Sequence, residues 1–435
     1  MSQTKNRWVA LVFISMAISL VIIDGTIVNT IFPAIIEDLS LSSTEVQWVQ
    51  ESYVLVFASL LLVWGSLADR YGRKLLLVVG IVIFVAASVW AGNTDSAETM
   101  ILARVIQGIG GAMVLPTTLS LVNANFQGKE RGIAFAIWGA TIGGMVAVGP
   151  VLGGWLATDF SWRWAFLINL PLGVIIIAGL MYFLGESKAE QRKGGIDWVG
   201  AIISVVMFST LVFGLIEGRV YGWWEQTKNQ FELFGFVWPA DTISVIPVSL
   251  ALSLIATVLF VLWERKREAA QKNVLLDLNL FRIASFRNGS IAAAIISMGE
   301  FGILFAIPLW LQNVLGLSPI SSGLVLLWLA GGAFVASGVG GALSGKLPAH
   351  RAVQLGVLLE LVGVAGVGFF ASPELGWAGV APFLFIYGIG IGLATAQLTG
   401  VIMVDVPMEQ IGQGSGSQST VRQIGSALGI AVLGS

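Results

Sequence analysis

Long apolar segments follow one another along the chain, and each ends at a short stretch of charged or turn-forming residues. Most of these segments are about 20 residues long, the length that a helix needs to cross a bilayer. Backbone groups in lipid must be satisfied within the segment, so each is predicted to be a helix. Thirteen spans are predicted, at 8–33, 46–67, 74–91, 99–123, 133–157, 164–184, 198–216, 243–263, 289–312, 323–343, 353–371, 377–404 and 415–435.

Composition supports an all-α polytopic membrane protein. Of 435 residues, 56% are hydrophobic and 11% are charged, against about 25% charged in soluble domains. The net charge of -2 excludes a basic nucleic-acid surface. The chain has no cysteine and one histidine, His350, so disulfides, a metal site, a bound cofactor and a catalytic cluster are not expected.

The positions of lysine and arginine predict the orientation. With a cytoplasmic amino terminus, 18 of the 23 basic residues lie inside, whereas Arg163, Arg219 and Lys228 lie outside and Arg104 and Arg422 lie within spans. The first apolar run is about 25 residues long, too long for a cleavable signal. We therefore expect a multi-pass protein of the cell (plasma or inner) membrane.

Charged residues within spans predict a functional cavity, because they are costly in lipid and face partners or water. Along the helices, Asp24 lies ~24 Å from the inner end of its span, Arg104 ~9 Å from the outer end and Glu300 ~20 Å from the inner end. These depths place an acid in each half of the chain at a similar level. Moving Arg104 toward or away from Asp24 would change the proton affinity of that carboxylate.

The predicted proton-coupling and substrate cavity contains Asp24, Arg104, Gln107, Glu300 and Glu360. Three alternatives are open. Asp24 could satisfy backbone groups at a kink beside Gly25, and Arg104 could be only its structural partner. Glu300 could form a hydrogen bond to neighbouring helices through Ser297 or backbone groups. Glu360 lies near the middle of its span, and the sequence favours neither a functional nor a structural role for it.

The turn between the second and third spans carries a dense motif, made of Gly65, Asp69, Arg70, Gly72, Arg73 and Lys74. Its glycines permit a tight turn and close helix approach. Asp69 can sit at the positive amino terminus of a neighbouring helix, and the bases can bind carboxylates or helix carboxyl termini. Such contacts would latch one conformation, whereas the simpler interpretation is a positive-inside loop.

This turn resembles motif A of the major facilitator superfamily. Residues 102–112 resemble motif B, and residues 139–154 resemble motif C, whose Gly149, Pro150, Gly153 and Gly154 predict a bend in the fifth span. Residues 24–29 and 422–425 resemble the first and thirteenth helices of the 14-helix drug:proton antiporter family in that superfamily. Met145 departs from motif C, where a glycine is common.

The resemblance implies two six-helix bundles with two extra central helices. It divides the chain into an amino-terminal bundle at 1–185, the extra helices and their links at 186–285, and an incomplete carboxyl-terminal bundle of five spans at 286–435, with the family's fourteenth helix apparently missing. The implied function is proton-coupled efflux of small amphipathic compounds, cationic ones included, by alternating access. The implied partners are the substrate, protons and the bilayer, and the expected state is a monomer. An exporter of one endogenous metabolite is the alternative among transporters. A channel or a membrane-embedded enzyme is the alternative from a different functional class.

Overall fold

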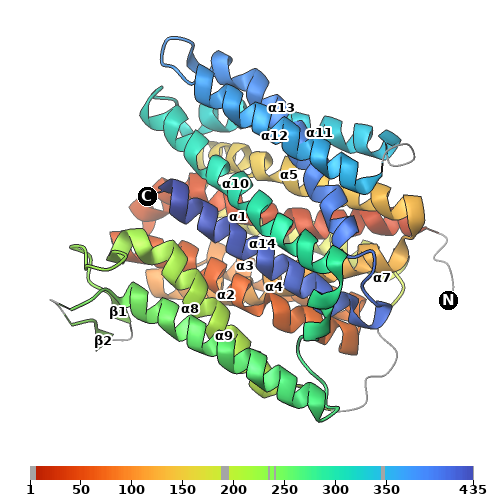
Figure 1. The fold of residues 1–435 in the computed structure, drawn as a ribbon. Helices are drawn as coiled ribbons and strands as arrows, with labels where there is room; N and C mark the ends of the chain where they lie inside the picture. Colours follow the sequence, from red (N-terminus) through yellow and green to blue (C-terminus); the bar gives the residue numbers. More distant parts are fainter. Residues whose placement is uncertain (1–5, 188–194, 234–235, 240–241, 344–347, 435) are drawn as a thin grey trace.

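The computed structural model describes residues 6–187, 195–233, 236–239, 242–343 and 348–434. Almost all of these residues lie in helices (Figure 1). The amino-terminal helices are α1 (Arg7–Leu39), α2 (Ser43–Tyr71), α3 (Arg73–Gly92), α4 (Ala97–Asn125), α5 (Gly128–Asp159), α6 (Trp164–Leu167) and α7 (Asn169–Phe183). The later helices are α8 (Trp198–Tyr221), α9 (Val245–Ala269), α10 (Ala284–Asn313), α11 (Pro319–Leu343), α12 (Ala349–Phe370), α13 (Gly376–Ile402) and α14 (Ile411–Gly434), with short 3-10 turns at Leu278–Arg282 and Met408–Gln410.

The predicted spans lie on these helices, with two local differences. Residues 164–184 form two helices, because the helix breaks at Ile168 between α6 and α7. The segment between α8 and α9, within a predicted loop, contains a small antiparallel hairpin of β1 (Glu232–Leu233) and β2 (Phe236–Val237).

Eleven helices among the described residues are long and apolar enough to cross a membrane. Helix α11 contains the apolar stretch Ile320–Ala336 within its described part. Helix α14 is not among these eleven helices. Its first half carries a run of buried polar side chains, Gln413, Ser415, Ser417, Gln418, Ser419 and Thr420. The helical membrane fold is therefore confirmed, while the count of thirteen spans stays a prediction.

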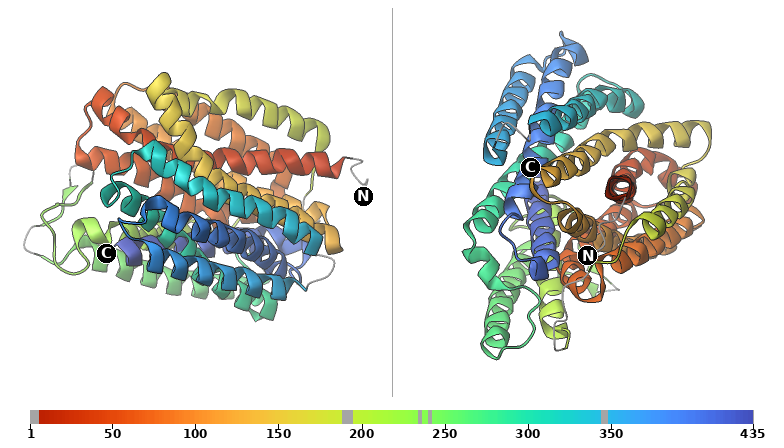
Figure 2. Two further views of the ribbon diagram at one scale, coloured as in Figure 1. Left: turned by 90° about the horizontal axis from the view of Figure 1, so that it is seen from above. Right: turned by 90° about the vertical axis from the view of Figure 1, so that its right-hand side faces the viewer.

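The helices gather into two groups with a pair at the edge. The end-on view in Figure 2 separates the red-to-yellow helices α1–α7 from the teal-to-blue helices α10–α14. Helices α8 and α9 pack against each other, and α8 also contacts α2 and α14, one helix from each group. The predicted boundaries at 185/186 and 285/286 stay a proposal that this arrangement accommodates.

Close helix contacts between the groups depend on residues without side chains. A Cβ atom added to Gly65 on α2 would lie 2.5 Å from the carbonyl oxygen of Gly412 and 2.7 Å from Cα of Gly416, both on α14. At Gly154 on α5, an added Cβ would lie 2.5 Å from Ile320 on α11. Small residues thus let these backbones approach, as at other membrane helix interfaces.

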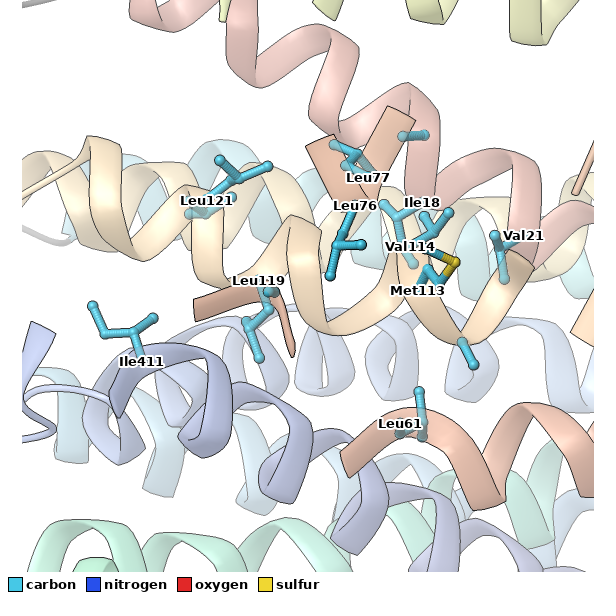
Figure 3. Close-up of a cluster of buried hydrophobic side chains, with 14 of the residues drawn as sticks. Ile18, Val21, Leu61, Leu76, Leu77, Met113, Val114, Leu119, Leu121 and Ile411 are labelled. Atoms are coloured by element: carbon cyan, nitrogen blue, oxygen red, sulfur yellow. The ribbon is translucent and has the colours of Figure 1, made fainter. Parts of the chain in front are cut away.

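The largest apolar cluster ties α1, α2, α3 and α4 together and extends to the start of α14 (Figure 3). Ile18 on α1, Leu61 on α2 and Leu77 on α3 are all fully buried in it. Ile411 brings α14 into the same cluster. This packing holds the helices that carry Asp24, Asp69 and Arg104 in fixed positions.

Candidate functional site

Asp24 and Arg104 form an ion pair inside the amino-terminal group of helices. Nη1 of Arg104 on α4 lies 2.6 Å from Oδ2 of Asp24 on α1. Gln107, one turn along α4, donates to Oδ1 of Asp24 at 2.7 Å and accepts from Arg104 at 2.6 Å. These three predicted site residues are at most 1% exposed and form one cluster.

Residues from three further helices complete this amino-terminal cluster. Asn169 on α7 donates to Oδ1 of Asp24 at 3.2 Å and to Ser88 on α3 at 2.9 Å. Nε of Arg104 donates to the Val49 carbonyl oxygen, and the guanidinium lies 4.1 Å from the centre of the Tyr53 ring. Both oxygens of Asp24 are thus hydrogen-bonded, so the buried charge is compensated.

Glu300 and Glu360 lie in a second cluster, built by α10, α12, α13 and α14. Thr395 on α13 donates to Oε1 of Glu300 at 2.6 Å, and Arg422 on α14 lies 3.4 Å from its Oε2. Glu360 on α12 is 9% exposed, and its Oε1 has no hydrogen-bond partner among the described residues. Glu360 interacts electrostatically with both Glu300 and Arg422. Two acidic side chains and one basic side chain therefore lie in this cluster.

The structure therefore divides the five predicted cavity residues between two places. Asp24, Arg104 and Gln107 belong to the amino-terminal cluster, and Glu300 and Glu360 belong to the carboxyl-terminal cluster. Within the described part of the chain, no hydrogen bond or ion pair joins the two clusters. A common cavity that contains all five stays a prediction. Glu300 is bonded to Thr395 rather than to Ser297.

Asp69 of motif A caps the amino terminus of α14. Its two oxygens accept from the backbone N–H groups of Gly412 at 2.8 Å and Gln413 at 3.1 Å. Arg73 pairs with Asp69 at 2.8 Å and donates to the Met408 carbonyl oxygen at 3.1 Å. An acid at a helix amino terminus satisfies unpaired N–H groups and complements the helix dipole. The contact joins the two groups of helices at one end.

The other motif A residues have different contacts. Gly72 has a φ of 118°, in the region that favours glycine, and lies against the carboxylate of Glu186. Lys74 donates to the carbonyl oxygens of Met181 and Leu184 at the carboxyl terminus of α7. Arg70 stacks on Tyr71. Asp69, Arg73 and Gly65 therefore contact α14 or the turn before it, while Lys74 binds the end of α7.

Motif C lies where α5 crosses α1. A Cβ on Gly149 would overlap Thr26 Oγ1, and one on Gly153 would lie 2.8 Å from Ile27 Cγ1. Pro150 lies inside α5, which continues to Asp159, so the bend itself stays a prediction. Gly153 thus packs against Ile27, three residues after Asp24, so α5 contacts α1 beside the amino-terminal cluster.

Comparison with known proteins identifies the family. The sequence model of the Major Facilitator Superfamily matches residues 14–216 and 197–430. The chain belongs to the Major Facilitator Superfamily. It is therefore a polytopic membrane transporter that acts on small molecules.

Relatives within this superfamily are resistance and export proteins. The chain is 30% identical to the tetracenomycin C resistance and export protein of Streptomyces glaucescens, over 98% of this chain and 75% of that protein. It is 33% identical to a probable actinorhodin transporter of Streptomyces coelicolor, over 99% of this chain and 72% of that protein. It is 30% identical to the multidrug resistance protein Stp of Mycobacterium tuberculosis, over 100% of this chain and 76% of that protein.

A solved structure agrees with the fold. The human organic anion transporter MFSD10 (TETRAN) superposes with a TM-score of 0.68, over 98% of this chain and 93% of that one, at 12% identity. At this identity the similarity concerns the fold alone.

Several residues at these sites were not singled out from the sequence. Ser88, Asn169 and Thr395 are neutral, so the pattern of charged residues within spans does not include them. Arg422 was noted within a span but not paired with Glu300, because the two are 122 residues apart. Asn169 has one usable signal, since it is a polar residue within a predicted apolar span.

Proposed function

We propose that this transporter exports small amphipathic compounds, cationic ones included, in exchange for protons, by alternating access. The observation that carries the proposal is the pair of buried acid clusters, one in each group of helices. The names of the relatives support drug export as the function class. The proton gradient is the proposed energy source, and a monomer with its amino terminus in the cytoplasm is the proposed state.

Asp24 is the proposed proton site of the amino-terminal cluster. In the described conformation its charge is compensated by Arg104, Gln107 and Asn169. In the proposed cycle, a proton on Asp24 takes the place of this compensation when Arg104 moves away. Proton binding at Asp24 is therefore linked to a change of helix packing, which is what coupling requires.

The carboxyl-terminal cluster is the proposed place where the cation exchanges with a proton. If Glu300 and Glu360 were both ionised, they would carry one more negative charge than Arg422 can balance. A buried excess charge is unfavourable unless a proton or a cation neutralises it. A cationic compound and a proton would thus compete for the same charge, without displacement of the Arg422 side chain.

The proposed latch of the conformational cycle is the contact between Asp69 and α14. Beyond this cap, the side chain of Gln413 donates to the Val274 carbonyl oxygen at 3.1 Å and accepts from Asp277 N–H at 3.3 Å. Gln413 therefore touches both motif A and the link between α9 and α10. Opening the predicted cytoplasmic side requires breaking these bonds together.

Uptake of ethidium into inverted membrane vesicles tests the proposal. A pH gradient with the acidic side inside the vesicles should drive saturable ethidium uptake by the wild-type protein. Asp24→Asn should abolish the component of uptake that depends on this gradient. Glu37→Gln is the matched control, because Glu37 is an exposed acid on the same helix. Equal gradient-dependent uptake by Asp24→Asn and wild type would contradict the coupling role, and non-saturable flux would favour a channel.

Export of one endogenous compound is the second candidate. Two relatives are named for single compounds, tetracenomycin C and actinorhodin. A panel of structurally unrelated cations and neutral compounds separates the two. Several unrelated substrates support the multidrug proposal, and a single accepted compound supports the dedicated exporter.

A further inference from the structure

A crevice lies between α2 and the extra helix α8. Its cavity volume is about 10 Å³, room for about one water-sized group. Three residues of each helix line it, Trp48, Glu51 and Leu55 on α2 and Phe213, Ile216 and Glu217 on α8. The crevice therefore combines one carboxylate and one aromatic ring from each wall.

Both carboxylates in this crevice have an unsatisfied oxygen. Glu217 is 2% exposed, and its buried Oε2 has no hydrogen-bond partner among the described residues. Oε2 of Glu51 is also buried and has none within the same part of the chain. Burying a carboxylate oxygen without a donor is unfavourable, so the crevice favours a ligand that brings positive charge and N–H groups.

The walls select the kind of cation. Trp48 and Phe213 both line the crevice, and aromatic rings attract ammonium groups. A calcium or magnesium ion needs six or more oxygen ligands or retained waters, whereas the crevice has two acids among mostly apolar walls. No group of three metal-ligating side chains occurs in the described residues. A primary ammonium group satisfies the two carboxylates and the rings together.

The depth of the crevice indicates what carries the ammonium group. Glu217 lies ~6 Å before the end of α8, and Glu51 ~12 Å after the start of α2. The chain beyond α8 carries the exposed residues Trp223 and Trp224, which are typical of the membrane interface. We propose that Glu51 and Glu217 bind the primary ammonium group of an amphiphile whose apolar part lies in the bilayer. An ethanolamine lipid and a free long-chain amine share this chemistry.

Native mass spectrometry of the purified full chain tests the site. With equal amounts of phosphatidylethanolamine and phosphatidylcholine of the same acyl chains, the wild type should retain about tenfold more of the former, because only it offers N–H donors. Glu217→Gln and, separately, the less buried Glu51→Gln should bring this ratio close to one. Glu225→Gln, an exposed acid after α8, should leave the ratio unchanged.

A second arm distinguishes the two sources. Dodecylamine, compared with dodecyltrimethylammonium, should bind in the absence of lipid if the site accepts free amines, and should fail to do so if it requires the lipid headgroup. In either case, loss of the wild type's preference for the primary ammonium in both Glu51→Gln and Glu217→Gln supports the site. No preference for the primary ammonium in both arms, or a preference that survives both substitutions, would overturn it. Because no transport is measured, the outcome is independent of the proposed efflux.

Discussion

The two buried acid clusters differ in how completely their charge is compensated. Both oxygens of Asp24 accept hydrogen bonds, and its ion pair with Arg104 is 2.6 Å long and fully buried. In the carboxyl-terminal cluster the Glu300–Arg422 pair is 3.4 Å long, the Arg422 side chain is 19% exposed, and Glu360 keeps an unsatisfied oxygen. Acidic side chains thus have their hydrogen-bonding capacity filled in the amino-terminal cluster but only partly filled in the carboxyl-terminal cluster.

This difference suggests a division of roles. A compensated, bonded pair resists change and responds only when helices move, whereas an under-compensated cluster can accept a charge without rearrangement. The amino-terminal cluster is therefore suited to sense conformation. The carboxyl-terminal cluster is suited to exchange a proton for a cation in the conformation described.

The largest effect is expected from Arg104→Ala. The substitution leaves Asp24 buried without its partner, which destabilises by about 3–5 kcal/mol. The equivalent change, Arg422→Ala, should destabilise much less, because that pair is longer and partly exposed. Thermal unfolding of the two purified variants measures the comparison. Equal losses of stability would mean that the clusters are not electrostatically different.

The next largest effect is expected from Gly149→Ala, which tests whether α5 holds α1 in place. The added methyl group overlaps Thr26, and overpacking of this kind destabilises by about 1–3 kcal/mol. Gly144→Ala is the matched control on the same helix, because an added Cβ there meets nothing within 4 Å. Unfolding temperatures of the pair should differ. If both alanines are tolerated equally, the contact does not support the amino-terminal cluster.

A selective effect is expected from Glu300→Gln. The amide keeps the shape and removes one negative charge, so transport of cationic compounds should fall about tenfold, which corresponds to 1.4 kcal/mol. Neutral compounds should be exported at close to the normal rate. Vesicle uptake of a cationic and a neutral substrate measures the ratio, with Glu374→Gln, an exposed acid, as control. An equal decline for both substrates would assign Glu300 to proton transfer or to structure.

The smallest effect on stability is expected from Asp69→Asn. The asparagine can still cap α14 but loses the charge that complements the helix dipole and Arg73, about 1 kcal/mol. The conformational balance should shift toward opening at the motif A side. Labelling of single cysteines introduced on either side measures the shift. An unchanged labelling ratio would indicate that motif A is only a positive-inside loop.

The sequence predicted the helices better than their partners. The apolar pattern placed 74–91 within one residue of α3 at each end, because charges and turn residues mark where a span leaves the bilayer. It ended the first span at Pro33, whereas α1 continues to Leu39. One proline removes a single backbone bond, which the rest of a long helix tolerates.

The candidate site was predictable in depth but not in direction. Counting residues placed Asp24 and Arg104 in the same half of the membrane, and the structure joins them. The depth of a residue in the membrane does not predict which face of its helix contacts which neighbouring helix. The sequence therefore predicts one cavity for Glu300, Glu360 and Asp24, where the structure has two clusters. Their partner Arg422 comes from a helix far along the chain, and only tertiary packing brings them together.

Proton release on substrate binding tests the central claim most directly. A cationic substrate added to the purified protein in weakly buffered solution should release about one proton per bound molecule, because the two compete for one excess charge. Glu360→Gln should bind the substrate more weakly and release none, while Glu374→Gln should match the wild type. Release of the same number of protons by Glu360→Gln, or none by the wild type, would contradict proton exchange at the carboxyl-terminal cluster.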